Sequence, residues 1–234
     1  MAPLLVYPPN SITIRAQPLT PSAFSPFGSV IQYPSSTPTS FSGKHSPIAG
    51  AITVNAGTAQ KHTAVTPFTN AYPLNKPRAS ANVNFFVCKP RKLLPAAVDN
   101  VAVSGIFKVK VLERHPYTTQ SFIPLGLPAP TRHEPTSSRY LVIVAPSLDS
   151  RGNPPDLANI KAFIAYGNQG VTYNVKTWHA PMVVLGKNEI GFVVLVHENQ
   201  VDGDDLELLN VGGEGVNVEI HEGLWGSRGE RAKL

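Results

Sequence analysis

Proline and glycine interrupt this chain at short intervals, and that spacing constrains its fold more than any other feature. The 234 residues include 23 Pro and 18 Gly, and only 15% are charged. Many short strands joined by turns explain this composition better than a helical bundle does. The sequence therefore predicts a mainly β protein. Because all-β chains of this length commonly form one domain, we expect a single domain over residues 1–234.

Short apolar or alternating stretches mark the expected strands. They lie at residues 11–17, 30–33, 51–55, 83–88, 104–112, 140–145, 171–175, 192–197 and within 202–220. A short helix is expected after the capping residue Thr20. A longer helix is expected over residues 154–167, because Leu157, Ile160 and Ile164 share one helical face. Roughly ten short strands around one or two short helices predict a jelly-roll β-barrel.

Three stretches are expected to lie outside the core. Residues 34–47 and 124–139 are rich in proline or in small polar residues, which is typical of long surface loops. Residues 226–234 are expected to form a flexible tail, and they end in Ala232-Lys233-Leu234. This tripeptide resembles the peroxisomal signal Ser-Lys-Leu, so the sequence predicts a peroxisomal location, and otherwise a cytoplasmic one.

Charge, hydropathy and cysteine content exclude several classes of function. The net charge is +5, but Lys and Arg are scattered and form no basic stripe, so we expect no nucleic-acid partner. The sequence has neither a signal peptide nor a run of about 18 apolar residues, so we expect a soluble protein without a membrane partner. The single cysteine, Cys88, follows an apolar run and is interpreted as a buried structural thiol in a reducing compartment.

Residues 113–126 carry the most informative polar cluster and are predicted to form a strand, a turn and a second strand. Side chains alternate along a strand, so Glu113 and His115 share one face while Arg114 points to the other. Gln120 can return to the first face after the turn. A carboxylate, an imidazole and an amide are costly to bury unless they bind each other, a ligand or a metal. This face is the predicted active site.

His179 is the expected partner of His115. Of the seven histidines, these two stand at strand edges beside proline, on strands that a jelly roll can bring together. With Glu113 and Gln120 they parallel the arrangement of metal ligands in cupins, although Glu replaces the first His and Gln replaces the usual Glu. These four side chains could hold a divalent ion or form a metal-free polar pocket. Both readings remain open.

Several blocks of sequence resemble the ureidoglycolate lyases, cupin-fold enzymes of allantoin and purine degradation. The first block is Leu-Glu-Arg-His-Pro at 112–116 with Thr-Gln-Ser-Phe-Ile-Pro at 119–124. The second comprises residues 156–157, 161–164, Gly167, 169–171, Tyr173, 178–179 and Pro181. A third, weaker block spans Asn55 to Lys61. Order and spacing agree over about residues 19–196, which is most of the chain.

The chain departs from this family at three positions. Bacterial members tend to have His where this chain has Asn174 and Ala180, and Arg where it has Lys61. His115 and His179 persist while the other two histidines do not. The resemblance therefore implies that Asn174 and Ala180 are not required for the chemistry.

The resemblance implies a cupin-like barrel and a homodimer. It also implies a carbon–nitrogen lyase of the amidine-lyase type, which cleaves ureidoglycolate to glyoxylate and urea. Such an enzyme removes a hydroxyl proton and protonates the departing urea nitrogen, for which two groups with pKa values near neutrality suffice and no cofactor is required. His115 and His179 are the expected base and acid, in an order that the sequence leaves open. Glu113 is expected to orient an imidazole.

The carboxylate of the substrate needs a cation or backbone donors. Lys61 is the first candidate, with Asn55 beside it, and Arg114 is an alternative. Gln120 and Tyr173 could hydrogen-bond the ureido group, or could equally be satisfied polar groups of the core.

Three alternatives to the lyase stay open at this point. One is a cupin that binds a small carboxylate without turnover, and another is a metal-dependent cupin oxygenase or isomerase. The third is an ammonia-releasing hydrolase, which acts on the same substrate and differs only in the bond that the pocket aligns.

Overall fold

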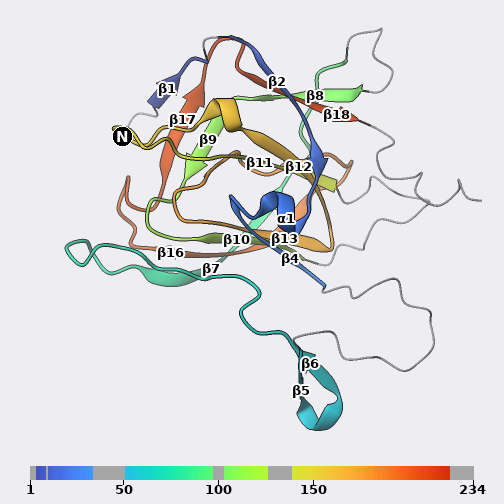
Figure 1. Ribbon diagram of the computed structural model, residues 1–234, viewed down its shortest axis with the longest axis vertical. Coiled ribbons are helices and arrows are strands. Elements are labelled where there is room, and N and C mark those ends of the chain that lie inside the picture. Colours follow the sequence, from blue (N-terminus) through green and yellow to red (C-terminus); the bar gives the residue numbers. More distant parts are fainter. Residues whose placement is uncertain (1–3, 9, 34–50, 97–102, 126–138, 222–234) are drawn as a thin grey trace, which may run out of the picture.

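The computed structural model describes residues 4–8, 10–33, 51–96, 103–125 and 139–221 (Figure 1). These residues form a mainly β structure, which confirms the predicted fold class. Within them lie one α-helix, α1 (Pro21–Phe24), and two short 3-10 helices, η1 (Asn55–Gly57) and η2 (Leu157–Asn159). The expected loop at 34–47, the tail at 226–234 and most of the loop at 124–139 lie outside the described residues.

The strands occur near most of the predicted positions. They are β1 (Leu4–Val6), β2 (Ile12–Arg15), β3 (Gln17–Pro18), β4 (Gly28–Gln32), β5 (Ile52–Val54), β6 (Ala59–Lys61), β7 (Ser80–Cys88), β8 (Val103–Val109), β9 (Val111–Arg114), β10 (Gln120–Pro124), β11 (Arg139–Ala145), β12 (Lys161–Tyr166), β13 (Gln169–Tyr173), β14 (Trp178–His179), β15 (Val183–Val184), β16 (Ile190–Glu198), β17 (Glu207–Val211) and β18 (Val216–His221). Helix α1 begins where predicted, because the Thr20 hydroxyl accepts a hydrogen bond from the Ala23 amide.

Three sheets form layers around two apolar clusters. The largest has the order β1-β17-β9-β14-β11-β12-β3, with β15 also paired to β11, while the five-stranded sheet has the order β4-β13-β10-β16-β7 and the three-stranded sheet β2-β18-β8. Every residue of β11 is buried, since its side chains alternate between one cluster and the other. Pairing among the described strands yields these separate sheets and no single closed ring.

The prediction of a longer helix over residues 154–167 is wrong. A single 3-10 turn, η2, follows the capping side chain of Asp156, and the chain then extends into β12, which pairs with β11. Side chains of β12 alternate between the two clusters, with Ile164 in one and Phe163 in the other. A strand buried on both faces is apolar at nearly every position, so a helical spacing of apolar residues arises within it by coincidence.

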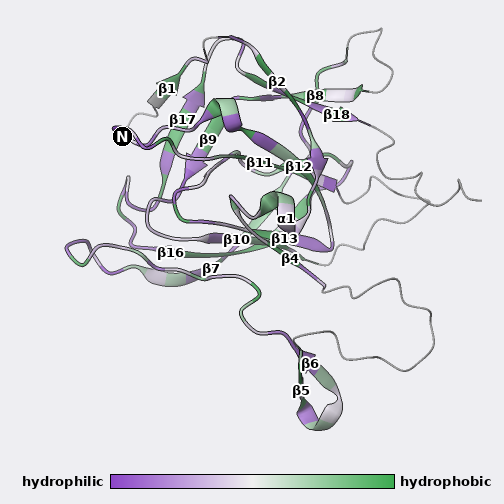
Figure 2. Cartoon of the chain, viewed as in Figure 1, coloured by the Kyte–Doolittle hydropathy of each residue, from purple (hydrophilic) through white to green (hydrophobic). Residues whose placement is uncertain are grey.

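The strand expected over 104–112 is interrupted at Lys110. Before this point β8 pairs with β18, and after it β9 pairs with β17 and β14 in a different sheet. Figure 2 shows that β9 changes from hydrophobic to hydrophilic along its length, as it passes from Leu112 to Glu113. The charged end of β9 therefore lies against β14, where Glu113 is paired in register with His179.

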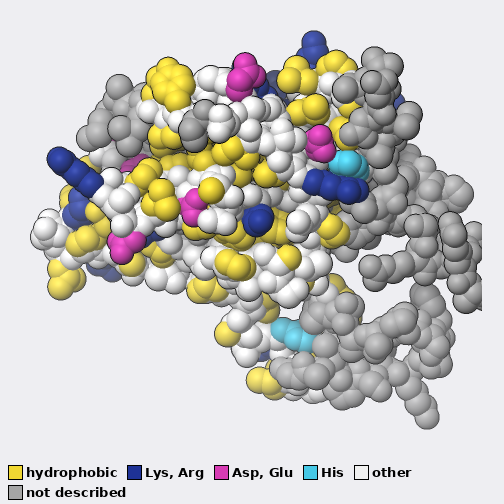
Figure 3. All heavy atoms as spheres, turned by 45° about the horizontal axis from the view of Figure 1, so that its top comes forward, with side chains coloured by type: hydrophobic (Ala, Val, Ile, Leu, Met, Phe, Trp, Pro, Cys, Tyr) yellow, Lys and Arg dark blue, Asp and Glu magenta, His cyan; other side chains and the backbone are white. Residues whose placement is uncertain are grey.

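Charged side chains are sparse on the face of the molecule shown in Figure 3, and its Lys and Arg residues lie in separate places. Among the described residues, no helix is long and apolar enough to cross a membrane.

Candidate active site

Glu113 and His179 form the first part of the site. The Nε2 atom of His179 lies 3.4 Å from Oε1 of Glu113, and its Nδ1 atom lies 3.1 Å from the backbone carbonyl oxygen of Thr177. A carbonyl oxygen can only accept, so Nδ1 carries a proton. Both ring nitrogens thus face oxygen atoms.

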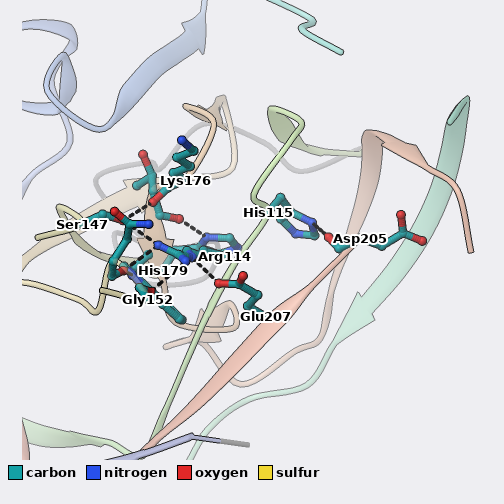
Figure 4. Close-up of polar contacts among 11 residues, drawn as sticks. Arg114, His115, Ser147, Gly152, Lys176, His179, Asp205 and Glu207 are labelled. Atoms are coloured by element: carbon teal, nitrogen blue, oxygen red, sulfur yellow. Dashed lines mark hydrogen bonds and ion pairs between the residues drawn. The ribbon is translucent and has the colours of Figure 1, made fainter. Parts of the chain in front are cut away.

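His115 has a different environment. Its Nδ1 atom donates to the backbone carbonyl of Asp205 at 2.5 Å (Figure 4), while Nε2 is buried without a hydrogen-bond partner. Burial, together with the charge of His179, lowers the pKa of His115 to about 4, although the Asp205 carbonyl, Glu113 and Gln120 oppose this shift. At neutral pH the ring is therefore uncharged, with the lone pair on Nε2.

The two histidines gather with two further polar groups. The ring centroids of His115 and His179 are 5.8 Å apart, and the ring of Tyr173 stacks on His179. Three buried atoms here have no partner, namely His115 Nε2, Gln120 Oε1 and the Tyr173 hydroxyl, and a fourth, His179 Nε2, has only the long contact with Glu113. Unpartnered polar atoms are rare in protein interiors, and several together indicate a place where a ligand supplies the partners.

A cavity of about 320 Å³ lies beside this group, and none of the four residues with these atoms belongs to its lining. Its lining consists of Phe86, Cys88, Lys89, Arg91, Glu113, Phe122, Pro181 and Met182. Burial alone would raise the pKa of Glu113, but the adjacent His179, and His115 when it is protonated at acidic pH, lower this pKa by more, so Glu113 is a carboxylate at neutral pH. Glu113 both lines the cavity and contacts His179, and it therefore connects the cavity with the buried histidines.

Sequence reasoning missed two cations in this lining, Lys89 and Arg91. They follow β7 directly, in the run Lys89-Pro90-Arg91, which the sequence marks only as the end of a strand. Cys88 precedes them, and it is half-buried: it packs against one of the two apolar clusters and also lines the cavity. Burial nevertheless raises the pKa of its thiol, so Cys88 stays protonated at neutral pH.

The structure does not bring Lys61 and Asn55 to the histidines. They lie on the hairpin of β5 and β6, which stands apart from the three main sheets in Figure 1. Asn55, Ala56 and Gly57 adopt positive φ angles, and the hydroxyl of Thr58 donates to the Asn55 carbonyl. Turn geometry therefore explains the Asn-x-Gly-Thr pattern without a substrate contact.

Arg114 also lies away from the cavity, on the opposite face of β9 from Glu113, as strand alternation predicts. Its guanidinium donates to Glu207, to Ser147 and to the backbone carbonyls of Gly152 and Asn153 (Figure 4). Its side chain is only 5% exposed and it stacks over Trp178. With its donors engaged, Arg114 braces the structure, and a role for it in substrate binding is not supported.

The residues expected as metal ligands lie near one another, but among the described residues no group of three or more His, Cys, Asp or Glu side chains is arranged to hold a metal ion. Two imidazoles, a carboxylate and an amide are suitable donors in chemical terms. The geometry of the described residues therefore does not define a metal site for the reaction.

The layered β-sheets and the buried group of two histidines and a carboxylate define a mainly β protein with a polar candidate site in its interior. The model of the family described as "Ureidoglycolate lyase" matches residues 11–219. The chain belongs to this family. It is 38% identical to the ureidoglycolate lyase of Saccharomyces cerevisiae over 80% of this chain and 87% of the relative. It is 36% identical to the ureidoglycolate lyase of Schizosaccharomyces pombe over 83% of this chain and 90% of the relative. It is 30% identical to the ureidoglycolate lyase of Burkholderia mallei over 91% of this chain and 92% of the relative.

Proposed function

We propose that this protein is a ureidoglycolate lyase, which converts ureidoglycolate to glyoxylate and urea. The observation that carries the proposal is the pairing of an uncharged imidazole, His115, with an imidazole held against a carboxylate, His179. One can accept a proton while the other can donate one, as cleavage of a hemiaminal requires. The names of the family and of the relatives supply the substrate.

The two histidines have separate roles in this proposal. Nε2 of His115 accepts the hydroxyl proton, a carbon–oxygen double bond forms, and the carbon–nitrogen bond breaks. His179 donates a proton to the departing urea nitrogen, and Glu113 stabilises its protonated ring. One proton is taken up and one is released, so the reaction consumes no co-reactant. Exchange of a proton between the two rings restores the starting state.

The remaining polar groups bind the substrate. The amide of Gln120 and the hydroxyl of Tyr173 supply hydrogen bonds to the ureido group, since both have a buried atom without a partner. Arg91 and Lys89 attract the carboxylate electrostatically at the cavity, in place of Lys61 and Asn55.

Product analysis tests this function directly. Purified protein is incubated with ureidoglycolate, and glyoxylate, urea and ammonia are measured separately, with and without divalent metal and after elemental analysis. Equal amounts of glyoxylate and urea are expected, with no ammonia. Release of ammonia would identify a hydrolase, and an absolute need for stoichiometric metal would identify a metal-dependent enzyme. Ligand binding without any product would identify a carboxylate-binding protein.

A homodimer is the proposed assembly, and the outer face of β7 supports it. The side chains of Val83, Phe85 and Val87 share this face and are 71%, 57% and 52% exposed. Strand β7 is the edge strand of its sheet and pairs only with β16 among the described strands. Exposed apolar patches of this kind mark sites of association. Light scattering should give twice the chain mass for the wild type. A monomeric mass for Phe85→Glu would place the interface on β7, whereas an unchanged dimer would exclude this face.

Peroxisomal import is proposed from the sequence alone, because Ala232, Lys233 and Leu234 lie outside the described residues. A fluorescent protein fused to the N-terminus should accumulate in peroxisomes. Deletion of the three residues should leave it in the cytosol, and import that survives the deletion would contradict the proposal.

A further inference from the structure

Asp205 contacts the site through its backbone and the rest of the fold through its side chain. Its carbonyl accepts the Nδ1 proton of His115. Its carboxylate accepts a hydrogen bond from the Tyr72 hydroxyl at 2.6 Å. It also accepts hydrogen bonds from the backbone amides of Asn199 at 2.8 Å and Gln200 at 2.7 Å. The orientation of the Asp205 peptide group, and with it the position of the carbonyl, is therefore tied to its own carboxylate.

Tyr72 joins the two segments that flank His115. Its hydroxyl reaches Asp205 and the backbone carbonyl of His197, whereas its ring packs against Tyr117, two residues beyond His115, at 5.3 Å. The neighbouring Ala71 amide donates to the Tyr117 carbonyl at 2.7 Å. The segment around Tyr72 thus holds the turn after His115 and the turn that carries Asp205 in one arrangement.

We propose that Tyr72 is a positioning residue, which acts through Asp205 to hold His115 in the tautomer with its proton on Nδ1 and its lone pair on Nε2. The inference rests on the proposed function only where it concerns turnover. Without the Tyr72 hydroxyl, one oxygen of the Asp205 carboxylate keeps only the Asn199 backbone amide, and the carboxylate that orients this peptide group is held less tightly. The His115 proton then loses its fixed acceptor and can move to Nε2, which is the tautomer that cannot accept a proton from the substrate.

Burial and the hydrogen bond to Asp205 raise the pKa of Tyr72 above its ordinary value, so its hydroxyl remains a donor across the working pH range. A tyrosine in this position therefore acts as a fixed brace and does not take part in proton transfer itself.

The test uses Tyr72→Phe, with Lys76→Gln as the matched control. Lys76 pairs with Asp204 on the same turn but does not contact the Asp205 carboxylate. The imidazole nitrogens of ¹⁵N-histidine-labelled protein are observed by NMR, which distinguishes the two neutral tautomers, and the His115 signals are assigned with His115→Gln. Steady-state turnover of ureidoglycolate is measured on the same samples.

For Tyr72→Phe we expect His115 signals from a mixture of tautomers, kcat lowered about ten- to hundredfold and KM changed less than twofold. Lys76→Gln should match the wild type in both measurements. A single Nδ1-protonated tautomer in Tyr72→Phe would overturn the proposal, and so would an equal change in both variants, which would indicate general loosening of the turn. If Tyr72→Phe does not fold, Asp205→Asn, which replaces one acceptor oxygen by a donor, takes its place with the same expected result. The NMR result stands even if the wild type is not a lyase, so the two failures are distinguishable.

Discussion

The ring of Tyr173 stacks on the imidazole of His179, with ring centroids 3.9 Å apart and planes inclined by 14°. This contact restricts rotation of the imidazole, and Glu113 contacts Nε2 of the same ring. The Tyr173 hydroxyl, by contrast, is buried without a partner, and burial raises the pKa of Tyr173 well above 10, so it stays a neutral donor. Stacking and hydrogen bonding can therefore be separated by substitution.

Tyr173→Phe keeps the stacked ring and removes only the hydroxyl. We expect kcat/KM to fall about tenfold, because a substrate hydrogen bond is lost. The free energy of unfolding should be unchanged or higher, since an unpartnered buried hydroxyl disappears. Steady-state kinetics and urea denaturation measure the two quantities. Reduced stability with unchanged kinetics would assign the hydroxyl to the core instead.

His179→Ala removes the proposed acid. We expect kcat to fall by about two orders of magnitude or more, the usual contribution of a positioned proton donor. His62→Ala serves as the comparison, because His62 is not buried and does not belong to the group of unpartnered atoms. Turnover of His179→Ala at the wild-type rate would remove this residue from the mechanism.

Arg91→Ala removes a cation from the cavity lining. We expect KM for ureidoglycolate to rise about tenfold with little change in kcat, because the carboxylate is bound equally in the ground and transition states. Lys92→Ala is the matched control, since Lys92 is exposed and outside the lining. Lys61→Ala tests the sequence-based alternative and should leave KM unchanged. If KM instead depends on Lys61 and not on Arg91, the hairpin contributes to the site.

Acidification should destabilise the wild type through His115. Its pKa is about 4 in the folded protein and 6.5 as its ordinary value, so between these values the unfolded chain binds more protons. Stability therefore falls as the pH is lowered through this window. Relative to pH 7, the loss from this residue at pH 5 is on the order of 2 kcal/mol. Chemical denaturation at both pH values should show a smaller drop for His115→Gln, and equal drops would contradict the buried, uncharged ring.

Local alternation was enough to predict much of the site. The face shared by Glu113 and His115, the opposite direction of Arg114 and the approach of His179 follow from side-chain alternation and from the later hairpin strand. The roles assigned to these residues stay predictions until kinetics test them. Glu113 and His179 come together because β9 and β14 pair in a register that sets these two residues opposite each other.

Other features depend on information that a single sequence does not contain. The double burial of β12 makes an apolar pattern that fits a helix as well as a strand. The turn formed by Asn55 and Gly57 places Lys61 on a separate hairpin, although its spacing suggests a functional motif. The contact between Asp205 and His115 joins residues 90 positions apart through a backbone carbonyl, which no side-chain pattern can reveal.

The pairing of β2 with β18 links distant parts of the chain, with Ile12 opposite Val216 and Arg15 opposite Glu219 in parallel register. During synthesis, β2 leaves the ribosome long before its partner exists. At rates of about 5–20 residues per second, the roughly 200 residues between them require on the order of ten seconds or more. Throughout that time Ile12 and Ile14 lack the strand with which they pair. We therefore expect nascent chains that stop before β18 to depend on chaperones, and release of the finished chain to coincide with closure of the three-stranded sheet.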